Sequence, residues 1–481
     1  MRTARFLLLS LVLALGACGG SRSATAPEEE APEYLDDGKS DGTSGLLTTA
    51  MVENATSRIF ATLTRVPDSS LSSRLVAASR RNVDVELYIV QPTPASAAKV
   101  ISAQHLEASG VHTVVDREDR CHFAAVVDQQ VTTVDADGKI HRSKVKSKVD
   151  AAVAAFRAVL QPEITSPPMK IEPDRVRLLR MPDETASEIV GLINGASTSI
   201  DLEIYQMEAP PILSALAAAV ARNVKVRVML EPKTVGAVNY TPVSEALKAA
   251  GVEVQPTPPA FDTSHKVDHA KFMVIDGTGL LFGTGNLVTS GLGGNPAKEF
   301  DTLDYWVEDG RAESVAEATQ LFEADWTRQP STGISFKNMV VTPDNSMERI
   351  VGLIDAAQTR LYVYNQSLND PAVLEHLVSA KVKGVEVRVL LGLQPGYGGE
   401  PPANQPAVDQ LVQAGIPAAL FSRHYLHTKV IVSDDRVFIG SQNFTAGGLR
   451  NNREVGEIFT DAAIAEELGQ TFLADEQAPL P

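Results

Sequence analysis

Residues 189–193 read IVGLI, and the same five letters recur at residues 350–354. After each copy the chain runs into a strand-like segment, SIDLEIY at 199–205 and RLYVYNQ at 360–366. A helical pattern followed at a fixed distance by a strand pattern, found twice, indicates an internal repeat. This self-similarity decides the fold, because the two copies must form two domains of one kind.

The similarity continues after these strands. Each copy has an Ala/Leu-rich helical pattern, then a β-branched strand, VKVRVML from Val224 or VEVRVLL from Val385. Another helical pattern ends at a glycine, Gly251 or Gly415, just before the next strand, and glycine commonly ends helices. Strands that alternate with helices predict an α/β fold, in which each unit is a mixed β-sheet flanked by helices on both faces.

An earlier copy of the unit precedes these two. A strand begins with RIFA at 58–61, VDVELYIV from Val83 matches the second strand, and ASGVHTVV from Ala108 matches the helix, glycine and strand that follow. Three units of domain size account for the chain after its N-terminal segment. Their expected bounds are residues 46–165, 166–335 and 336–481.

The N-terminus has the features of a signal peptide. Arg2 and Arg5 precede the apolar run FLLLSLVLAL at 6–15, which is too short to span a bilayer. The next letters, LGAC at 15–18, resemble the lipobox of bacterial lipoproteins, in which the cysteine is lipidated and becomes the new N-terminus. A plain secretory signal is the alternative. We expect a signal peptide at residues 1–17.

Cys18 would then anchor the chain in the cell envelope. Gly19 follows it in place of an acidic residue, and by resemblance to lipoproteins of two-membrane bacteria this points to the outer membrane. Residues 18–45 are rich in Gly, Ser, Pro and acidic residues, so they predict a disordered linker. Cys121 is the other cysteine, so a lipidated Cys18 leaves no intramolecular disulfide.

The chain is acidic, with 60 Asp and Glu against 43 Lys and Arg and a formal net charge of −17. Such a charge repels the phosphate backbone of nucleic acids, whose binding proteins usually carry clusters of basic residues. A nucleic-acid substrate is therefore disfavoured, although a locally basic groove can exist in an acidic protein.

The middle and last units contain the same set of polar residues, HxKxxxxD, then a G(S/T)xN turn, then a glutamate. The middle unit has His269, Lys271, Asp276, Thr284, Asn286 and Glu299, and the last unit has His427, Lys429, Asp434, Ser441, Asn443 and Glu454. On a strand, residues i and i+2 point to one face, so the His and Lys of each motif project together. One such pair is more often a solvated strand edge, but two in corresponding positions of a repeat indicate a functional site.

These motifs resemble the HKD motifs of the phospholipase D superfamily, and the resemblance covers residues 166–481. It implies tandem phospholipase D-like domains whose two active halves are related by a pseudo-two-fold axis. The two motifs would then form one phosphodiesterase site, which acts without a metal ion or another cofactor.

The resemblance also implies a mechanism. His269, in the N-terminal motif, would attack phosphorus and form a phospho-histidine. His427 would protonate the leaving alcohol and then activate water. Lys271 and Lys429 would stabilise the charge of the phosphoryl oxygens.

The other motif residues take supporting parts in this interpretation. Glu299 and Glu454 would hydrogen-bond the histidine rings and set their tautomers. Asp276 and Asp434 belong to the catalytic motifs but would support the site and not react. The expected substrate-binding residues are Thr284, Asn286, Ser441 and Asn443.

The middle unit departs from the motif in two ways. Thr284 replaces the usual serine, although its hydroxyl can form the same bonds. An extra Gly-rich stretch, residues 291–296, either shapes the pocket entrance or is a tolerated insertion; the sequence slightly favours the second. His265 and His424 lie just upstream of the two motifs, where they are either substrate contacts or, as favoured, surface or strand-edge residues.

The first unit has lost the motif. Cys121 occupies the position of the histidine and Phe123 that of the lysine, while Asp128 is retained. His122 is adjacent to Cys121 and would point to the opposite face of a strand, so the two cannot form a catalytic pair. VDAD at 134–137 replaces the asparagine turn. We expect a structural, non-catalytic domain.

The favoured function is a phospholipase D-type enzyme, a monomer that hydrolyses phospholipid head groups at the membrane that anchors it. Three alternatives stay open: transphosphatidylation, as in cardiolipin synthases; an HKD endonuclease; and a non-enzymatic envelope protein, which the intact double motif disfavours.

Overall fold

The computed structural model describes residues 47–92, 97–108, 111–117, 124–134, 140–160, 164–184, 186–232, 241–258, 265–393 and 402–477. Cys18, Cys121, His122 and Phe123 lie outside the described residues. The lipid anchor and the replacement of the motif in the first unit therefore stay predictions.

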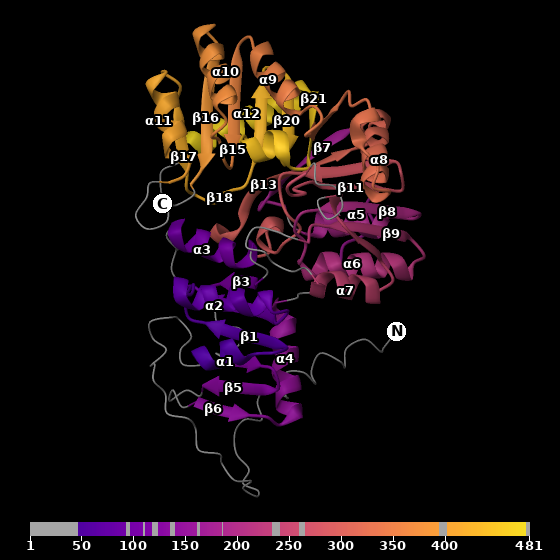
Figure 1. Cartoon of the computed structure of the whole chain (residues 1–481), viewed down its shortest axis with the longest axis vertical. Helices are drawn as coiled ribbons and strands as arrows, with labels where there is room; N and C mark the ends of the chain where they lie inside the picture. The colour runs from indigo at the N-terminus through magenta and orange to yellow at the C-terminus, as the bar shows by residue number, and fades with distance from the viewer. Residues whose placement is uncertain are drawn as a thin grey trace, which may run out of the picture. The chain divides into compact units, whose positions relative to one another are not determined.

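The chain forms three sheets, one from each unit (Figure 1), and these sheets share one strand order. In the first unit the order is β3-β2-β1-β4-β5-β6. These strands are β1 (Arg58–Leu63), β2 (Asp84–Val90), β3 (His112–Asp116), β4 (Ala124–Val127), β5 (Gln130–Val134) and β6 (Ile140–Ser143). The pairs β1–β2 and β2–β3 are parallel, whereas β1–β4, β4–β5 and β5–β6 are antiparallel, so the sheet is mixed.

The middle sheet repeats this order as β10-β9-β8-β11-β12-β13, and β7 pairs with β13. The strands are β7 (Val176–Met181), β8 (Ser199–Ile204), β9 (Lys225–Leu230), β10 (Glu253–Pro256), β11 (Lys271–Ile275), β12 (Gly279–Gly283) and β13 (Thr302–Asp309). The last sheet has the order β17-β16-β15-β19-β20-β21-β14. Its strands are β14 (Met339–Thr342), β15 (Arg360–Asn365), β16 (Glu386–Gly392), β17 (Ala418–Phe421), β19 (Lys429–Ser433), β20 (Arg436–Gly440) and β21 (Glu454–Thr460).

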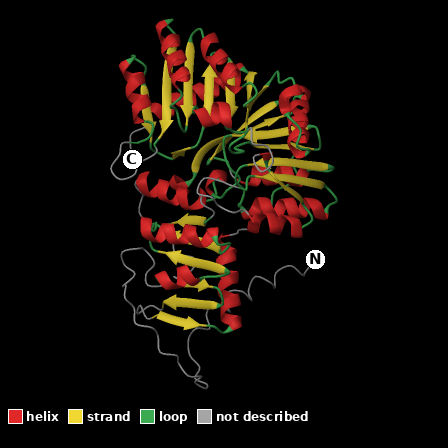
Figure 2. Cartoon of the chain, viewed as in Figure 1, coloured by secondary structure: helices red, strands yellow, loops and turns green. Residues whose placement is uncertain are grey.

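Helices cover both faces of each sheet (Figure 2). In the first unit these are α1 (Thr49–Asn54), α2 (Ser69–Arg80), α3 (Ala97–Ala108) and, on the other face, α4 (Lys146–Leu160). In the middle unit they are α5 (Ala186–Gly195), α6 (Pro210–Ala221), α7 (Thr241–Ala249) and, opposite, α8 (Ala312–Trp326). In the last unit they are α9 (Ser346–Ala356), α10 (Pro371–Val382), α11 (Gln405–Gln413) and, opposite, α12 (Ala462–Gln477). The α/β prediction with mixed sheets is confirmed.

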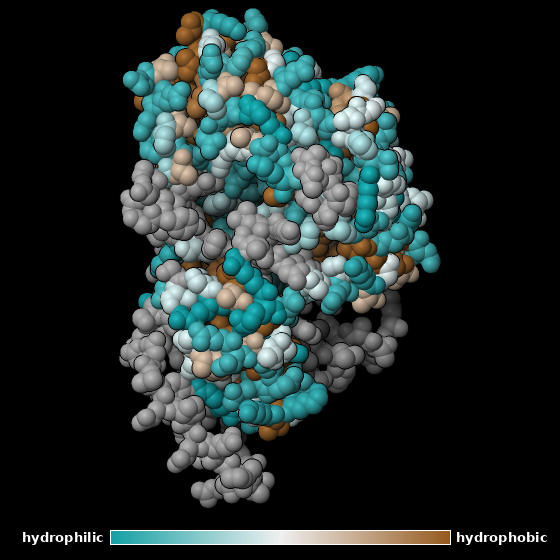
Figure 3. Space-filling model, in the orientation of Figure 1, coloured by the Kyte–Doolittle hydropathy of each residue, from teal (hydrophilic) through white to brown (hydrophobic). Residues whose placement is uncertain are grey.

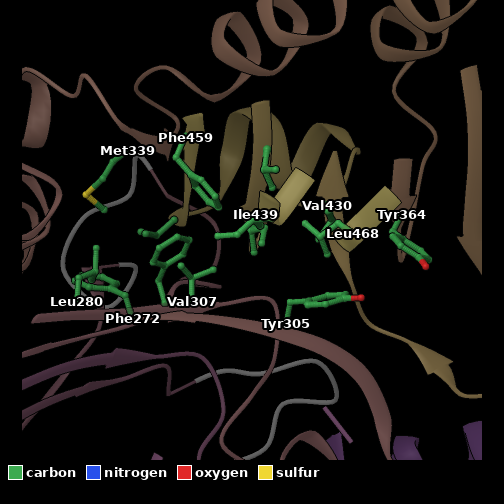
Figure 4. Close-up of a cluster of buried hydrophobic side chains, with 14 of the residues drawn as sticks. Phe272, Leu280, Tyr305, Val307, Met339, Tyr364, Val430, Ile439, Phe459 and Leu468 are labelled. Carbon is green, nitrogen blue, oxygen red and sulfur yellow. The ribbon is translucent and has the colours of Figure 1, made fainter. Parts of the chain in front are cut away.

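The middle and last sheets pack on each other through one apolar core (Figure 4). Phe272 and Leu280 of the middle sheet belong to the same cluster as Val430 and Ile439 of the last sheet, and all four are at most 1% exposed. A short strand, β18 (Tyr425–Leu426), leaves the last unit to pair in parallel with β13. The middle and last units are thus joined by a continuous core and by the pairing of β18 with the sheet of the middle unit.

The surface is mostly hydrophilic in the view of Figure 3, with hydrophobic residues in small scattered groups. Val145, Val382 and Val412 are the exposed large hydrophobic residues of the described part of the chain. Within that same part, no helix combines the length and the apolar character needed to cross a bilayer.

Candidate active site

The two histidines of the motifs lie side by side where the middle and last units meet. Their ring centroids are 6.4 Å apart. The backbone N–H of His269, just before β11, donates to the carbonyl of Arg453 at 2.7 Å. The backbone N–H of His427, just before β19, donates to the carbonyl of Leu303 at 3.2 Å. Each histidine is therefore fixed by the chain of the opposite half, as a pseudo-two-fold arrangement requires.

Each imidazole is also held by a carboxylate of the opposite half. His269 Nδ1 lies 2.8 Å from Glu454 Oε2, and His427 Nδ1 lies 2.9 Å from Asp304 Oδ1. A carboxylate only accepts hydrogen bonds, so both Nδ1 atoms carry the proton and both Nε2 atoms keep their lone pair. This is the tautomer that an attacking or proton-accepting histidine needs.

Asp304 takes the place that the sequence assigned to Glu299. The expectation for Glu299 is wrong: its carboxylate pairs with Arg117 at 2.6 Å, and its partner is not a histidine. The register shows the true equivalence, since Thr284 N donates to Tyr305 O just as Ser441 N donates to Val455 O. These bonds align Asp304 with Glu454.

The cause of this error is an insertion combined with a substitution. The Gly-rich stretch moves the carboxylate farther from Asn286 along the chain, and the residue type is Asp in place of Glu. Counting from the start of β13 and not from the asparagine would have found Asp304, because both carboxylates stand at the beginning of the strand that pairs with β12 or β20.

The two lysines are fully buried beside the histidines. Lys271 Nζ donates to the carbonyl of its own His269 at 2.6 Å, and Lys429 Nζ donates to the carbonyl of His427. Burial lowers the pKa of Lys271 to about 7, although the charges of Glu454, Asp268 and Asp304 oppose this. Burial likewise lowers the pKa of Lys429 well below its usual value. An anion that enters the site would favour the protonated, cationic form of both lysines.

Burial also controls the histidines. It lowers the pKa of His269 to about 4 against the opposing pull of Glu454, and the pKa of His427 to about 4 against that of Asp304. Burial would raise the pKa of Asp304, but the charge and hydrogen bond of His427 and the charge of Lys429 outweigh it and bring this pKa to about 2. At neutral pH the two imidazoles are therefore neutral and Asp304 is ionised.

The hydroxyls expected to bind substrate instead serve the framework. Thr284 and Ser441 are completely buried. Thr284 Oγ1 donates to Asp304 Oδ1 at 2.6 Å and accepts from Tyr305 N, while Ser441 Oγ accepts from Val455 N at 3.0 Å. A side chain engaged in this way steadies the carboxylate-bearing strand and cannot reach a substrate.

The two asparagines remain candidates for substrate contact. Asn286 Nδ2 donates to Gln206 Oε1 at 2.7 Å. The Oδ1 atoms of Asn286 and Asn443 are buried and have no hydrogen-bond partner among the described residues. Because the two ends of an amide cannot be told apart by shape, either could turn an N–H toward a phosphoryl oxygen.

Asp276 and Asp434 do not belong to the reacting groups. Each follows the far end of its strand, five residues from the lysine, which is roughly 16 Å along an extended chain. Asp276 accepts from the backbone N–H groups of Ser197 and Thr198 at 2.9 and 2.7 Å. Asp434 accepts in the same way from residues 358–360. These contacts agree with a supporting and not a reacting role, and both residues tie the loop before β8 or β15 to the sheet.

Other residues near the motifs lie elsewhere than the sequence indicated, or were not expected at the site at all. His265 is buried, so it is not a surface residue, whereas His424 is half-buried and directly precedes β18. Tyr205 meets His269 edge-on with ring centroids 4.7 Å apart, and Tyr425 stacks over His427 at 6.4 Å. Tyr205 ends the strand quoted at the outset, and nothing in the sequence marked it as part of the site.

Comparison with known proteins agrees with this geometry. The family "Cardiolipin synthase, PLD-like domain" matches residues 189–326 and 350–475, which together make up more than half of the chain. Cardiolipin synthase A of Pseudomonas putida strain W619 is 27% identical over 264 residues, 49% of this chain and 54% of that protein. Major cardiolipin synthase ClsA of Bacillus subtilis strain 168 is 23% identical over 234 residues, 43% of this chain and 48% of that protein.

The chain thus spans about half the length of these two relatives. Among solved structures, phosphatidylserine synthase of Haemophilus influenzae Rd KW20 is similar in fold, with a TM-score of 0.50 and 13% identity over 63% of this chain and 87% of that chain. With both halves matched by one family and both motifs joined in one site, the chain belongs to the phospholipase D superfamily, as a protein with cardiolipin synthase-type, phospholipase D-like domains.

Proposed function

We propose that this protein transfers a phosphatidyl group from one phospholipid to an alcohol, as cardiolipin synthases do, and that hydrolysis by water is a side reaction. The sequence alone favoured hydrolysis. The relatives favour transfer, because the two described above are cardiolipin synthases. The observation that carries the proposal is the pair of buried imidazoles, each fixed through Nδ1 by a carboxylate of the other half.

In the first step, His269 Nε2 attacks the phosphorus of the donor lipid and forms a P–N bond. The P–O bond to the head-group alcohol breaks, and the leaving oxygen takes a proton from His427 Nε2. The negative phosphate of the donor stabilises the protonated form of His427, since a nearby anion raises the pKa that burial lowers. Lys271 and Lys429 balance the charge of the remaining phosphoryl oxygens.

In the second step, an acceptor alcohol occupies the place of the departed head group. His427, now neutral, takes the hydroxyl proton, the alcohol oxygen bonds to phosphorus, and the P–N bond to His269 breaks. Asp304 keeps His427 in one tautomer through both proton transfers, as Glu454 does for His269.

Burial favours an alcohol over water in this second step. The side chains of His269 and His427 are only 12% and 10% exposed, and both lysines are fully buried. A site that excludes bulk water lowers the local concentration of the competing nucleophile, so a lipid-borne hydroxyl is favoured.

The test is a product analysis with vesicles of phosphatidylglycerol and the full-length chain. Transfer predicts cardiolipin and glycerol in equal amounts, with less phosphatidic acid. Phosphatidic acid as the main product would show that the protein hydrolyses the lipid and does not transfer its phosphatidyl group. Nicking of plasmid DNA at a comparable rate, with no lipid product, would overturn the proposal in favour of a nuclease.

A further inference from the structure

The Gly-rich insertion of the middle unit is a contact surface for the first unit. We name residues 287–301 the docking loop; it connects the turn of Asn286 to β13. His112 Nε2 of β3 lies 3.0 Å from Thr289 Oγ1, and the backbone N–H of Ser290 donates to Glu107 Oε1 at 3.1 Å. The interpretation as a merely tolerated insertion is therefore wrong.

The same loop adds a backbone connection to the edge of the first sheet. Ala297 N donates to Val115 O at 3.0 Å, and Val115 N donates to Asn295 Oδ1 at 2.8 Å. Gln104 of α3 donates to the carbonyl of Phe300. The docking loop thus continues the hydrogen bonding of the first sheet beyond β3.

Apolar contacts and one ion pair complete the interface. Ala297 and Phe300, each 1% exposed, are counted in the hydrophobic core of the first unit together with α3 and β2. Glu299 between them pairs with Arg117, which follows β3. The first unit would have an incomplete core without these two side chains of the middle unit.

The other end of the docking loop leads through Thr302 to Asp304, which contacts His427. Asn295 N and Nδ2 donate to Asp301 Oδ1 at 3.0 and 2.9 Å. Thr302 Oγ1, in the next residue, donates to Asp304, and Asp304 holds His427 at 2.9 Å. Asn295 therefore links the first unit, through Val115, to the segment that carries Asp304.

The corresponding loop of the last unit has different contacts. Residues 443–453 are held by the middle and last units: Asn451 O accepts from Lys266 N at 2.8 Å, and Arg450 pairs with Asp370. The His269–Glu454 pair is thus supported by another part of the molecule than the His427–Asp304 pair.

We propose that the first unit is a positioning module for one half of the active site. It binds the docking loop and thereby fixes Asp304 against His427, while it leaves the His269–Glu454 pair untouched. This proposal deepens the proposed function, since it assigns a role within the same site, and rests on that site for its effect on catalysis.

The test compares two interface variants with a matched control in the full chain. Thr289→Val removes the contact with His112, and Arg117→Gln removes the ion pair with Glu299. The two changes are combined in one double variant. The control is Arg74→Gln, which breaks an ion pair with Glu53 elsewhere in the first unit. Arg74 and Arg117 have nearly the same side-chain exposure, 38% and 39%, so the two changes are comparable.

The readout is the ring N–H signal of each histidine in NMR spectra of protein with ¹⁵N-labelled histidine, assigned by loss in His269→Gln and His427→Gln. A ring N–H bonded to a buried carboxylate exchanges slowly and gives a sharp downfield signal. We expect the double variant to speed exchange at His427 by about tenfold or more and to lower kcat by a similar factor. The His269 signal should be unchanged, and the control should resemble the wild type in both signals. A double variant with Arg117→Lys in place of Arg117→Gln keeps the cation, so it should regain most of the slow exchange at His427 and most of kcat.

Two results in a folded double variant would overturn the positioning role: both histidine signals unchanged, or both affected to the same extent. The measurement needs no substrate. If the wild type is inactive on lipids but its His427 signal still depends on the interface, the proposed function fails while the positioning role stands.

Discussion

His427 is held by Asp304, whose surroundings differ from those of Glu299. The carboxylate receives hydrogen bonds from Thr284 and Thr302 and is completely buried. These hydrogen bonds hold the carboxylate of Asp304 in place, and in the proposed mechanism it faces the imidazolium of His427. Glu299, which the sequence pattern preferred, is instead 23% exposed and faces Arg117.

This difference predicts unequal effects of two isosteric substitutions. Asp304→Asn should lower kcat by about 10²-fold or more, because an amide can donate to His427 Nδ1 and stabilise the wrong tautomer. Glu299→Gln should cause a much smaller loss, through the docking loop alone. Steady-state kinetics of the two variants decide this, and the reverse order of effects would return the orienting role to Glu299.

The buried site also predicts the pH dependence of kcat/KM, which follows the pKa values of the free protein. The proposed attack requires a neutral His269 and the proton donation requires a charged His427, and burial lowers the pKa of both to about 4. The value of kcat/KM should therefore be highest near pH 4 and fall on either side. Charge stabilisation requires a protonated Lys271, whose pKa burial lowers to about 7, so the fall should steepen as the pH rises through about 7. The alkaline limb of kcat should lie at higher pH, since bound phosphate stabilises the cationic forms of His427 and Lys271. A kcat/KM that stays constant from pH 4 to pH 9 would contradict this account.

At the scale of the elements, one aspartate at the same position of each repeat ties a loop to the sheet. Asp128, Asp276 and Asp434 all have positive φ, of 50°, 55° and 55°, and each accepts backbone hydrogen bonds from the loop before the first strand of its sheet. Aspartate tolerates this left-handed conformation better than most residues. Asp128 is retained where the rest of the motif is lost, which fits a structural role.

Asp434→Ala should therefore weaken folding and leave the chemistry intact. Loss of bonds from the N–H groups of residues 358–360 should lower the free energy of unfolding by about 2 kcal/mol. Denaturant unfolding measures this, and kcat per folded molecule should stay near the wild-type value. Asp435→Ala, at the adjacent exposed position, is the control. A stable but inactive Asp434→Ala protein would restore a catalytic role.

Repetition made much of this fold predictable from the sequence. The strands expected from Ser199, Val224, Arg360 and Val385 are β8, β9, β15 and β16, within one residue at their starts. The pairing of His and Lys followed from the two-residue period of a strand. Asp304 was missed because an insertion and a changed residue type obscured the repeat at that point.

Contacts between units had no local signal in the sequence. The exchange of β18 into the middle sheet and the burial of Phe300 in the core of the first unit join segments far apart in the chain. Neither leaves a periodic pattern, since each depends on how separate units pack. The burial of His265 was missed for the same reason.

At the scale of the whole molecule, we propose that a lipid on Cys18 keeps the enzyme next to its phospholipid substrate. Cys18 lies outside the described residues, so this proposal rests on the lipobox-like LGAC. Cys18→Ser should release the protein from the membrane fraction or leave it unprocessed, because stable anchoring requires acyl chains in the bilayer. Fractionation and immunoblotting measure this; a Cys18→Ser protein that stays membrane-bound would exclude lipidation as the anchor.

The central claim is that two motifs make one site with a covalent phospho-histidine, and rapid-quench mass spectrometry tests it most directly. Full-length protein is mixed with phosphatidylglycerol, quenched within milliseconds, digested and searched for a phosphatidyl adduct. We predict an adduct at His269, absent from His269→Ala, with turnover lowered by about 10²-fold or more in both His269→Ala and His427→Ala. His376→Ala, which removes a partly exposed histidine of α10, should behave as the wild type. Turnover without any histidine adduct, or near-wild-type turnover in either motif variant, would contradict the shared site.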